Sequence, residues 1–142
     1  MHNVLCLIID LLINRGYIIK VEVRNMKVYL AGGMKTGWQD EVKRLASGHD
    51  YYDPRIDTQQ TYYFTMTSQD LEGIDDADMV FAYYEVDNPS GIGLALEIGY
   101  ALAKGKRIVV IDEHESIHVF LASCCERLFT DFRKAANWLN TK

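Results

Sequence analysis

The chain has 142 residues, of which 49% are hydrophobic and 25% charged, with a formal net charge of −5 at pH 7. A chain of this length and composition forms one globular domain with a buried core. The negative charge argues against nucleic acid or an anionic membrane surface as the main partner. The apolar run at residues 4–13 is too short to cross a bilayer, so we expect no membrane partner.

Three cysteines, Cys6 and the adjacent pair Cys124 and Cys125, form no pattern typical of a disulfide framework or a zinc site. We therefore expect free thiols in a reducing, cytoplasmic environment. Residues 1–25 are predicted to be an N-terminal appendage, because Met26 directly precedes a strong strand pattern. Residues 26–142 are then the folded domain.

Residues 27–34 are predicted to form the first parallel strand, a short buried run that ends in glycines. Gly32 and Gly33 let the backbone turn sharply and leave room for a ligand at the carboxyl end of this strand. A helix follows over residues 37–47, and a second short strand over residues 49–53. The glycine spacing is not the G-x-G-x-x-G of dinucleotide-binding folds, so that fingerprint is not supported.

The segment after the second strand has a weaker pattern. Asp53-Pro54-Arg55 is expected to form a loop on the same side of the sheet as the first glycines. Thr, Gln and Tyr are frequent over residues 58–73, where a partly helical segment is predicted from about Tyr63. Ser68 would cap the last turns of this segment, and Asp70 would then lie in a first helical turn.

The second half of the chain is more regular. A turn at residues 88–91 leads into a helix that closes at Gly105. Its apolar residues Leu94, Ile98, Ala101 and Leu102 recur at helical spacing. The other predicted elements are strands at residues 79–84, 107–112 and near 128–129, and a helix over residues 131–139.

Strands alternate with helices throughout, which is typical of an α/β protein whose parallel sheet is covered on both faces. We predict a flavodoxin-like three-layer fold with a five-stranded parallel sheet in the order 2-1-3-4-5. Ligands of such sheets bind beyond the carboxyl ends of the strands at the switch point, here between the first and third strands. Gly32-Gly33, Asp53-Pro54 and residues 88–97 should meet in one crevice there.

Glu97 lies beside the apolar stripe of its predicted helix, where a charge is costly unless it has a partner or a task. A carboxylate in a half-apolar pocket can act as a nucleophile or a general base. Glycosidic bond cleavage uses a second carboxylate, for which the candidates are Asp70, Asp78 and Asp87. The alternative is that Glu97 only caps the helix or compensates its dipole.

Three segments carry a family resemblance. They are Val28-Tyr29-Leu-Ala-Gly-Gly33, Asp70-Leu-Glu-Gly-Ile-Asp-Asp-Ala-Asp78 and Gly93-Leu-Ala-Leu-Glu97-Ile-Gly-Tyr-Ala-Leu-Ala-Lys-Gly-Lys106. In sequence, order and spacing they resemble the nucleoside 2-deoxyribosyltransferase family, which includes related 2′-deoxynucleoside 5′-phosphate N-hydrolases. The resemblance covers about residues 27–112.

The resemblance implies roles for three residues. Glu97 matches the family's nucleophile, which forms a glycosyl ester at C1′ of the deoxyribose. Asp70 matches an aspartate that contacts the nucleobase and assists its protonation. Tyr29 matches the strand tyrosine that positions the nucleophile.

The pattern breaks at Gly91, because many family members have an acidic residue there that holds the sugar hydroxyls. The related N-hydrolases bind a 5′-phosphate with a serine of this loop, near Ser90, and the amides at a helix N-terminus favour a phosphate. A plain N-cap is the alternative for Ser90, and Arg55 and Lys35 are candidate cations. The predicted substrate-binding residues are Gly32, Gly33, Asp87, Asn88, Ser90, Gly91 and Gly93.

The resemblance implies an enzyme of nucleotide salvage, a pentosyltransferase or N-glycosidase. It would cleave the N-glycosidic bond of a 2′-deoxyribonucleoside through a covalent glycosyl-Glu97 intermediate and transfer the sugar to another base. One alternative is a 2′-deoxynucleoside 5′-monophosphate N-glycosidase, which transfers the sugar to water. The other is a non-catalytic nucleotide-binding module on the same fold.

No metal or organic cofactor is expected. His114 and His118 would form a metal pair only on a helix and with a third ligand, so a surface loop is the favoured interpretation. The expected partner is a small nucleoside or nucleotide. Family enzymes borrow residues from a neighbouring subunit near the C-terminus, where Asn137 and Asn140 are candidates, so a homo-oligomer is expected.

Overall fold

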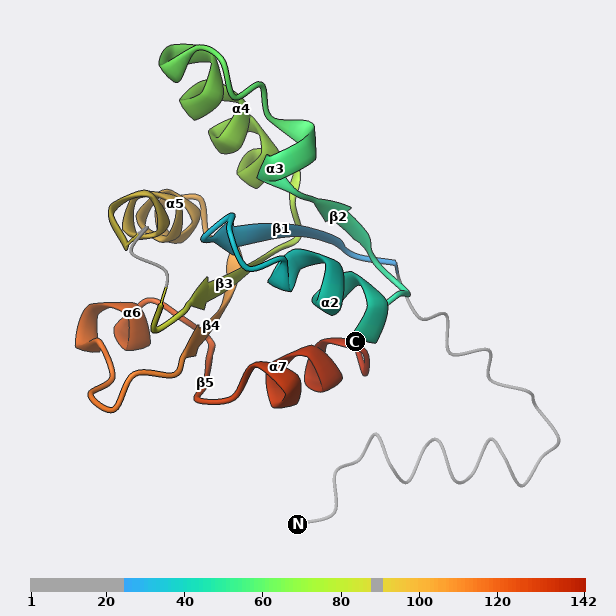
Figure 1. Ribbon diagram of the computed structural model, residues 1–142, viewed down its shortest axis with the longest axis vertical. Coiled ribbons are helices and arrows are strands. Elements are labelled where there is room, and N and C mark those ends of the chain that lie inside the picture. The colour runs from blue at the N-terminus through green and yellow to red at the C-terminus, as the bar shows by residue number, and fades with distance from the viewer. Residues whose placement is uncertain (1–24, 88–90) are drawn as a thin grey trace, which may run out of the picture.

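A computed structural model describes residues 25–87 and 91–142 (Figure 1). The strands are β1 (Lys27–Gly32), β2 (Asp50–Tyr52), β3 (Met79–Tyr84), β4 (Arg107–Asp112) and β5 (Arg127–Phe129). The helices are α2 (Trp38–Leu45), α3 (Pro54–Asp57), α4 (Tyr63–Asp76), α5 (Gly91–Ala103), α6 (Val119–Ser123) and α7 (Phe132–Leu139). The predicted appendage, residues 1–25, lies almost wholly outside the described residues and stays a prediction.

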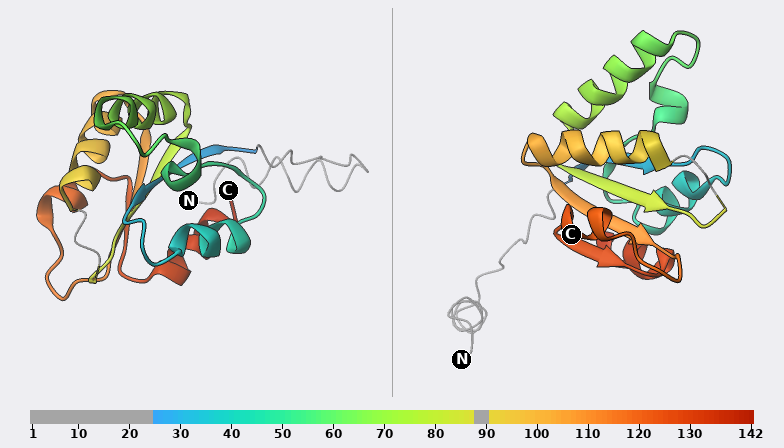
Figure 2. Two further views of the ribbon diagram at one scale, coloured as in Figure 1. Left: turned by 45° about the horizontal axis from the view of Figure 1, so that its top comes forward. Right: turned by 90° about the vertical axis from the view of Figure 1, so that its left-hand side faces the viewer.

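The five strands form one parallel sheet in the order β2-β1-β3-β4-β5. This arrangement confirms the predicted flavodoxin-like fold. The three central strands are buried along nearly their whole length, since both faces of the sheet are covered. Helices α2 and α7 cover one face and α4, α5 and α6 the other (Figure 2).

Strand alternation divides the core in two, because successive side chains of a strand point to opposite faces. Val28, Phe81 and Val109 pack against α2 and α7. On the other face, Tyr29 and Val80 pack against Ile74 of α4 and against the buried stripe of α5. The predicted stripe residues Leu94, Ile98 and Ala101 are at most 3% exposed, whereas Leu102, predicted with them, is 52% exposed.

The segment predicted as a loop after β2 forms the short helix α3. Asp53 is its N-cap, since the side chain accepts a hydrogen bond from the amide of Arg55 (3.1 Å), and Pro54 supplies the fixed φ of the first helical position. Lys43 and Arg55 both pair with the Asp53 carboxylate, at 2.6 and 2.8 Å. This buried carboxylate therefore ties α3 to α2.

Helix α4 runs without a break from Tyr63 to Asp76, so the predicted cap at Ser68 is wrong. The hydroxyl of Ser68 donates to the carbonyl of Thr65 (3.0 Å), which is a bond within the helix. Asp70 accordingly lies in the middle of α4 and not in a first turn. The helix begins at Tyr63, as predicted, and no glycine or proline interrupts the turns before Asp70.

Gly73 lets α4 lie close against β2. A Cβ atom at this position would come within 2.7 Å of the ring of Tyr52, closer than side chains pack. The helix therefore sits directly over Tyr52, with Asp70 one turn before the contact. At the end of α5, Gly105 has a φ of +66°, which confirms the predicted stop signal of this helix.

Among the described residues no helix is both long enough and apolar enough to cross a membrane.

Candidate active site

Glu97 contacts β1 through a hydrogen bond to Tyr29. The phenol of Tyr29 donates to Glu97 Oε1 at 2.7 Å, across 68 residues of sequence. Strand alternation places the fully buried Tyr29 on the α5 face, and Glu97 is the seventh residue of that helix. Tyr29, the strand tyrosine predicted to position Glu97, is thus in direct contact with it, and the positioning role stays a prediction.

Burial of the carboxyl group raises the pKa of Glu97 from 4.5 to about 8. The Tyr29 hydroxyl opposes this shift, and the nearby charge of Asp70 adds to it. Burial also raises the pKa of Tyr29, with Glu97 and Asp70 adding to the effect, so the phenol stays protonated and remains a donor. The structure therefore brings Tyr29, Asp70 and Glu97 into one electrostatically coupled cluster.

Asp70 is oriented by a hydroxyl that sequence reasoning missed. Thr58, which is 5% exposed, donates to Asp70 Oδ1 at 2.6 Å. The phenol of Tyr52 lies 3.0 Å from Thr58 Oγ1 and donates to the carbonyl of Gln69 at 3.0 Å. Burial raises the pKa of Asp70, although the hydroxyls of Thr58 and Tyr29 oppose the shift.

Tyr52 also forms part of the wall of this cluster. Its ring stacks on that of Tyr29, with centroids 5.3 Å apart and planes 16° from parallel. The sequence signal for such a wall is the set of adjacent tyrosine pairs among the nine tyrosines, Tyr51-Tyr52, Tyr62-Tyr63 and Tyr83-Tyr84. Thr58 had no comparable signal, because its contact with Asp70 depends on the turn of α3, which the pattern did not predict.

Gly32 and Gly33, the glycines predicted at the carboxyl end of the first strand, both make contacts within the protein. A Cβ atom at Gly32, whose φ is +148°, would lie 2.6 Å from the carbonyl oxygen of Tyr83 in the neighbouring strand. The carbonyl of Gly33 accepts hydrogen bonds from Trp38 and Gln39, both at 2.8 Å. These contacts account for both glycines, and their role in substrate binding stays a prediction.

The other predicted binding residues follow β3. Asp87 is exposed, Gly91 begins α5, and a Cβ atom at Gly93 would meet no neighbour within 4 Å. A Cβ atom at Gly91 would make ordinary contact with the ring of Tyr84 at 3.5 Å, so there is room for a larger side chain. Asn88 and Ser90 lie outside the described residues.

Asp78 and Arg55, two candidate site residues from the sequence, make contacts outside the cluster of Tyr29, Asp70 and Glu97. Asp78 accepts a hydrogen bond from the amide of Lys27 (2.9 Å), at the amino ends of β1 and β3, so it is not the second carboxylate. Arg55 forms ion pairs with Asp53 and Asp40 at 2.8 and 2.6 Å. Arg55 is thus engaged between α3 and α2, and its candidate role as a cation for a phosphate stays a prediction.

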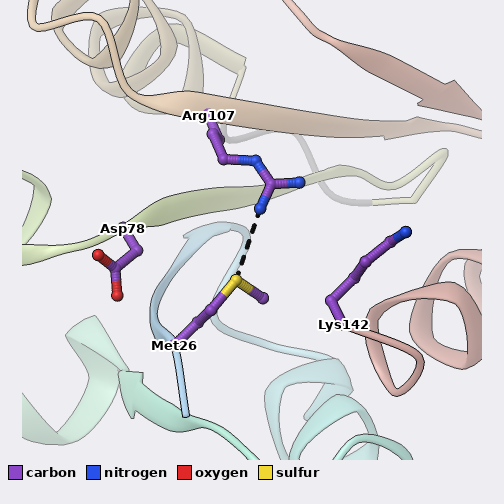
Figure 3. A pocket seen from close by; sticks show the side chains of 4 residues that line it. All are labelled: Met26, Asp78, Arg107 and Lys142. Carbon is purple, nitrogen blue, oxygen red and sulfur yellow. Dashed lines mark hydrogen bonds between the residues drawn. The ribbon is translucent and has the colours of Figure 1, made fainter. Parts of the chain in front are cut away.

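A hollow of about 330 Å³ lies at the amino edge of the sheet, lined by Met26, Asp78, Arg107 and Lys142 (Figure 3). Arg107 spans it and contacts the sulfur of Met26 at 3.5 Å. Ligands of open parallel sheets bind at the carboxyl ends of the strands, so this hollow is not our candidate site. In the described part of the chain, no three His, Cys, Asp or Glu side chains gather into a possible metal site.

The protein has an open α/β sheet and a cluster that contains two neighbouring acidic groups. Comparison with known proteins identifies the family to which it belongs. A family model described as "Nucleoside 2-deoxyribosyltransferase like" matches residues 25–115. The chain belongs to this family. Membership confirms the resemblance predicted from the three sequence segments, and with it the expected class of enzyme, a pentosyltransferase or N-glycosidase.

Solved structures with the same fold include three at low sequence identity. A 2-deoxyribosyltransferase of Bacillus psychrosaccharolyticus is 23% identical, with 78% of this chain and 90% of that chain covered and a TM-score of 0.64. A 2-deoxyribosyltransferase of Leishmania mexicana is 18% identical, covering 82% and 97%, with a TM-score of 0.63. A CMP N-glycosidase of Clostridium botulinum is 18% identical, covering 81% and 98%, with a TM-score of 0.59. A comparison with curated proteins found no match.

Proposed function

We propose that this protein cleaves the N-glycosidic bond of a 2′-deoxyribonucleoside through a covalent intermediate on Glu97 and transfers the sugar to a second base. The observation that carries the proposal is the cluster of Tyr29, Glu97 and Asp70, two carboxyls with raised pKa joined to one phenol. Membership of the family supports the reaction class. A helix-capping role does not explain why the half-buried Glu97 carboxyl lies in the second turn of α5, hydrogen-bonded to a strand tyrosine.

Glu97 and Asp70 have different roles in the first step. Because burial raises both pKa values, the pair holds a proton near neutral pH. The reactive arrangement has the charge on Glu97, which the Tyr29 donor favours, and the proton on Asp70. Glu97 attacks C1′ as the bond from C1′ to the base nitrogen breaks, and Asp70 protonates the departing base.

The second step reverses these roles. The nitrogen of an incoming base attacks C1′ of the glycosyl ester, the ester bond to Glu97 breaks, and Asp70 takes the proton of the incoming nucleophile. Water in place of the second base gives hydrolysis. The transition state resembles an oxocarbenium ion, which nearby carboxylates stabilise, so the residues of the cluster supply the groups that the reaction needs.

The proposal is tested by chromatographic measurement of free base and new nucleoside. The protein is incubated with a panel of 2′-deoxyribonucleosides and their 5′-monophosphates, each with and without an acceptor base. A transferase forms the new nucleoside when the acceptor is added, and a hydrolase releases base at the same rate without it. Absence of base release from the whole panel, with ligand binding retained, would instead support a binding module.

Tyr29→Phe is expected to lower kcat/KM roughly tenfold, because a hydrogen bond to a charged group is worth about that factor. Loss of the donor disfavours the charge on Glu97 and raises its pKa further. In the wild type, kcat/KM should fall above about pH 8, where the pair loses its last proton. In Tyr29→Phe this decline should move to higher pH.

The matched control for Tyr29→Phe is Tyr83→Phe. Tyr83 also has a phenol that donates to a carboxylate, Glu113 at 2.6 Å, but it faces α2 and α7 on the other side of the sheet. The control should leave the pH profile in place. An unchanged profile in Tyr29→Phe, or an equal shift in both variants, would contradict the coupling of Tyr29 to the reacting carboxyl.

We also propose that the protein self-associates through the start of α4. This end of the helix extends away from the sheet (Figures 1 and 2), and its N-cap Tyr62 and first residues Tyr63 and Phe64 are 65%, 82% and 95% exposed. Three adjacent aromatic side chains exposed to this degree favour an interface. Light scattering should give the mass of an oligomer for the wild type and a smaller mass for Phe64→Ser; a wild-type monomer would refute the interface.

A further inference from the structure

Thr58, the C-cap of α3, is joined to the middle of α4 through its hydroxyl group. The residue is 5% exposed, and the hydroxyl donates to Asp70 Oδ1 at 2.6 Å. A hydroxyl that donates to a carboxylate at such a distance forms a charge-assisted hydrogen bond, roughly twice as strong as one between neutral groups. The bond therefore stabilises the ionised form of Asp70 more than the protonated form. In accord with this, Thr58 opposes the rise that burial causes in the pKa of Asp70.

The hydroxyl of Tyr52 leaves the Thr58 proton to Asp70. Tyr52 lies 3.0 Å from Thr58 Oγ1 and donates to the carbonyl of Gln69, also at 3.0 Å. A phenol has one proton and a carbonyl oxygen can only accept, so this bond uses the Tyr52 proton. Thr58 then has two acceptors within reach, the Tyr52 oxygen at 3.0 Å and the Asp70 carboxylate at 2.6 Å. The nearer, charged acceptor gives the stronger bond, so Thr58 donates to Asp70.

Packing holds this pair of hydroxyls in place. The Tyr52 ring stacks on that of Tyr29, with centroids 5.3 Å apart. On α4, Gly73 lies so close that a Cβ atom there would come within 2.7 Å of the Tyr52 ring. The Thr58 hydroxyl, which contacts Tyr52, is therefore preorganised, and it need not reorient when a charge forms on Asp70.

The charge on Asp70 changes during the proposed first step. As the bond from C1′ to the base nitrogen breaks, its electron pair leaves with the base, and the proton of Asp70 passes to a base nitrogen. Glu97 becomes a neutral ester, so Asp70 is left as the charged member of the pair. The Thr58 hydrogen bond is thus stronger in the transition state than before it, which lowers the barrier. A base that departs as an anion leaves the proton on Asp70, and for such a base Thr58 lowers no barrier.

We propose that Thr58 is a positioning residue for the acid step: its hydroxyl stabilises the charge that develops on Asp70 as the proton passes to the departing base. This inference rests on the proposed function of the same site. It adds a specificity to that function, because the Thr58 hydroxyl favours substrates whose base must be protonated in order to leave. In the second step the carboxylate takes up the proton of the incoming base, and the Thr58 proton stays on its own oxygen throughout.

Thr58→Val tests this role, because valine keeps the branched shape and lacks the hydroxyl. Two substrates are compared well below the alkaline decline at about pH 8: a natural 2′-deoxyribonucleoside and its analogue with a nitro-substituted base, which departs as a stabilised anion. The ratio of kcat/KM for the natural substrate over the analogue should fall roughly three- to tenfold. A full hydrogen bond to a charged group is worth about tenfold, and only part of the charge has developed in the transition state. An unchanged ratio would overturn the proposal.

The ratio separates this role from a loss of folding, because a smaller fraction of folded protein lowers both rates equally. Thr58→Ser keeps the hydroxyl and should keep the wild-type ratio, whereas Thr58→Ala should lower it as Thr58→Val does. Thr67→Val is the matched control, since Thr67 donates to the backbone carbonyl of Tyr63 at 3.1 Å, on the same helix as Asp70. The control should keep the wild-type ratio. An equal fall in Thr67→Val or in Thr58→Ser would also overturn the proposal.

A second measurement does not depend on turnover. The carboxyl NMR signal of Asp70 is followed with pH in Glu97→Gln, where Asp70 titrates without its neighbouring carboxyl, and in the same variant with Thr58→Val added. Loss of the donor disfavours the charged form, so the pKa of Asp70 should be higher when Thr58→Val is present, and an equal pKa would overturn the proposal. If the wild type releases no base although the pKa differs in this way, the proposed function alone fails. If it releases base and the substrate ratio is unchanged in Thr58→Val, this inference alone fails.

Discussion

Glu97→Gln is expected to abolish base release, with a fall in kcat of about 10⁴-fold or more, as for the loss of a nucleophile that forms a covalent intermediate. Glutamine has nearly the shape of glutamate and its carbonyl can still accept the hydrogen bond of Tyr29. It cannot form the glycosyl ester. Substrate binding should survive, because the change leaves the walls of the site intact, and initial rates with saturating substrate measure the loss.

The pH dependence of thermal stability shows whether Glu97→Gln is folded. The pKa of Glu97 rises to about 8 in the folded chain, so between pH 4.5 and 8 the folded state binds more protons than the unfolded state. The free energy of unfolding of the wild type therefore decreases as pH rises through this window and stays low above it. Glu97→Gln lacks this loss and should melt at a higher temperature than the wild type above pH 8. An inactive variant of lower stability would leave a folding defect as the cause and contradict this account.

Asp70→Asn is expected to lower kcat/KM by about 10²- to 10⁴-fold, the usual contribution of a general acid. The loss should be smallest for bases that leave without protonation. The pH profile should also change its direction. The wild type needs one proton on the pair and declines above about pH 8, whereas Asp70→Asn needs only an ionised Glu97, so its residual activity should rise with pH.

Asp76→Asn is the matched control for Asp70→Asn. It lies on the same helix, and its exposed ion pair with Lys27 at 3.2 Å is worth at most about 1 kcal/mol. The control should keep the wild-type profile. If Asp70→Asn keeps the alkaline decline, the proton that is lost at high pH does not belong to the pair of Asp70 and Glu97.

The central strands and α5 could be predicted because local pattern and burial agree there. The runs at β3 and β4 are short and apolar almost throughout, a pattern typical of a strand covered on both faces. In α5, Leu94 and Ile98 mark the buried face and Gly105 marks the end. Glu97 was conspicuous for the same reason, as a charge beside a buried stripe.

Elements whose structure depends on distant partners could not be predicted. The turn of α3 exists because the buried Asp53 caps it and pairs with Lys43 on another helix. Thr58 acquires its role only when that turn brings it to Asp70. His114 was interpreted as a surface residue, since nothing in its own loop indicates that Asp112 is fully buried and holds the ring.

The covalent intermediate on Glu97 is the central claim, and mass spectrometry of the quenched protein tests it most directly. The wild type is mixed with substrate in the absence of an acceptor base, stopped with acid during turnover, and digested. We predict a deoxyribosyl adduct on the peptide that contains Glu97, chased by an added acceptor base and missing from Glu97→Gln. An adduct on a different residue, or turnover by Glu97→Gln at the wild-type rate, would contradict the account.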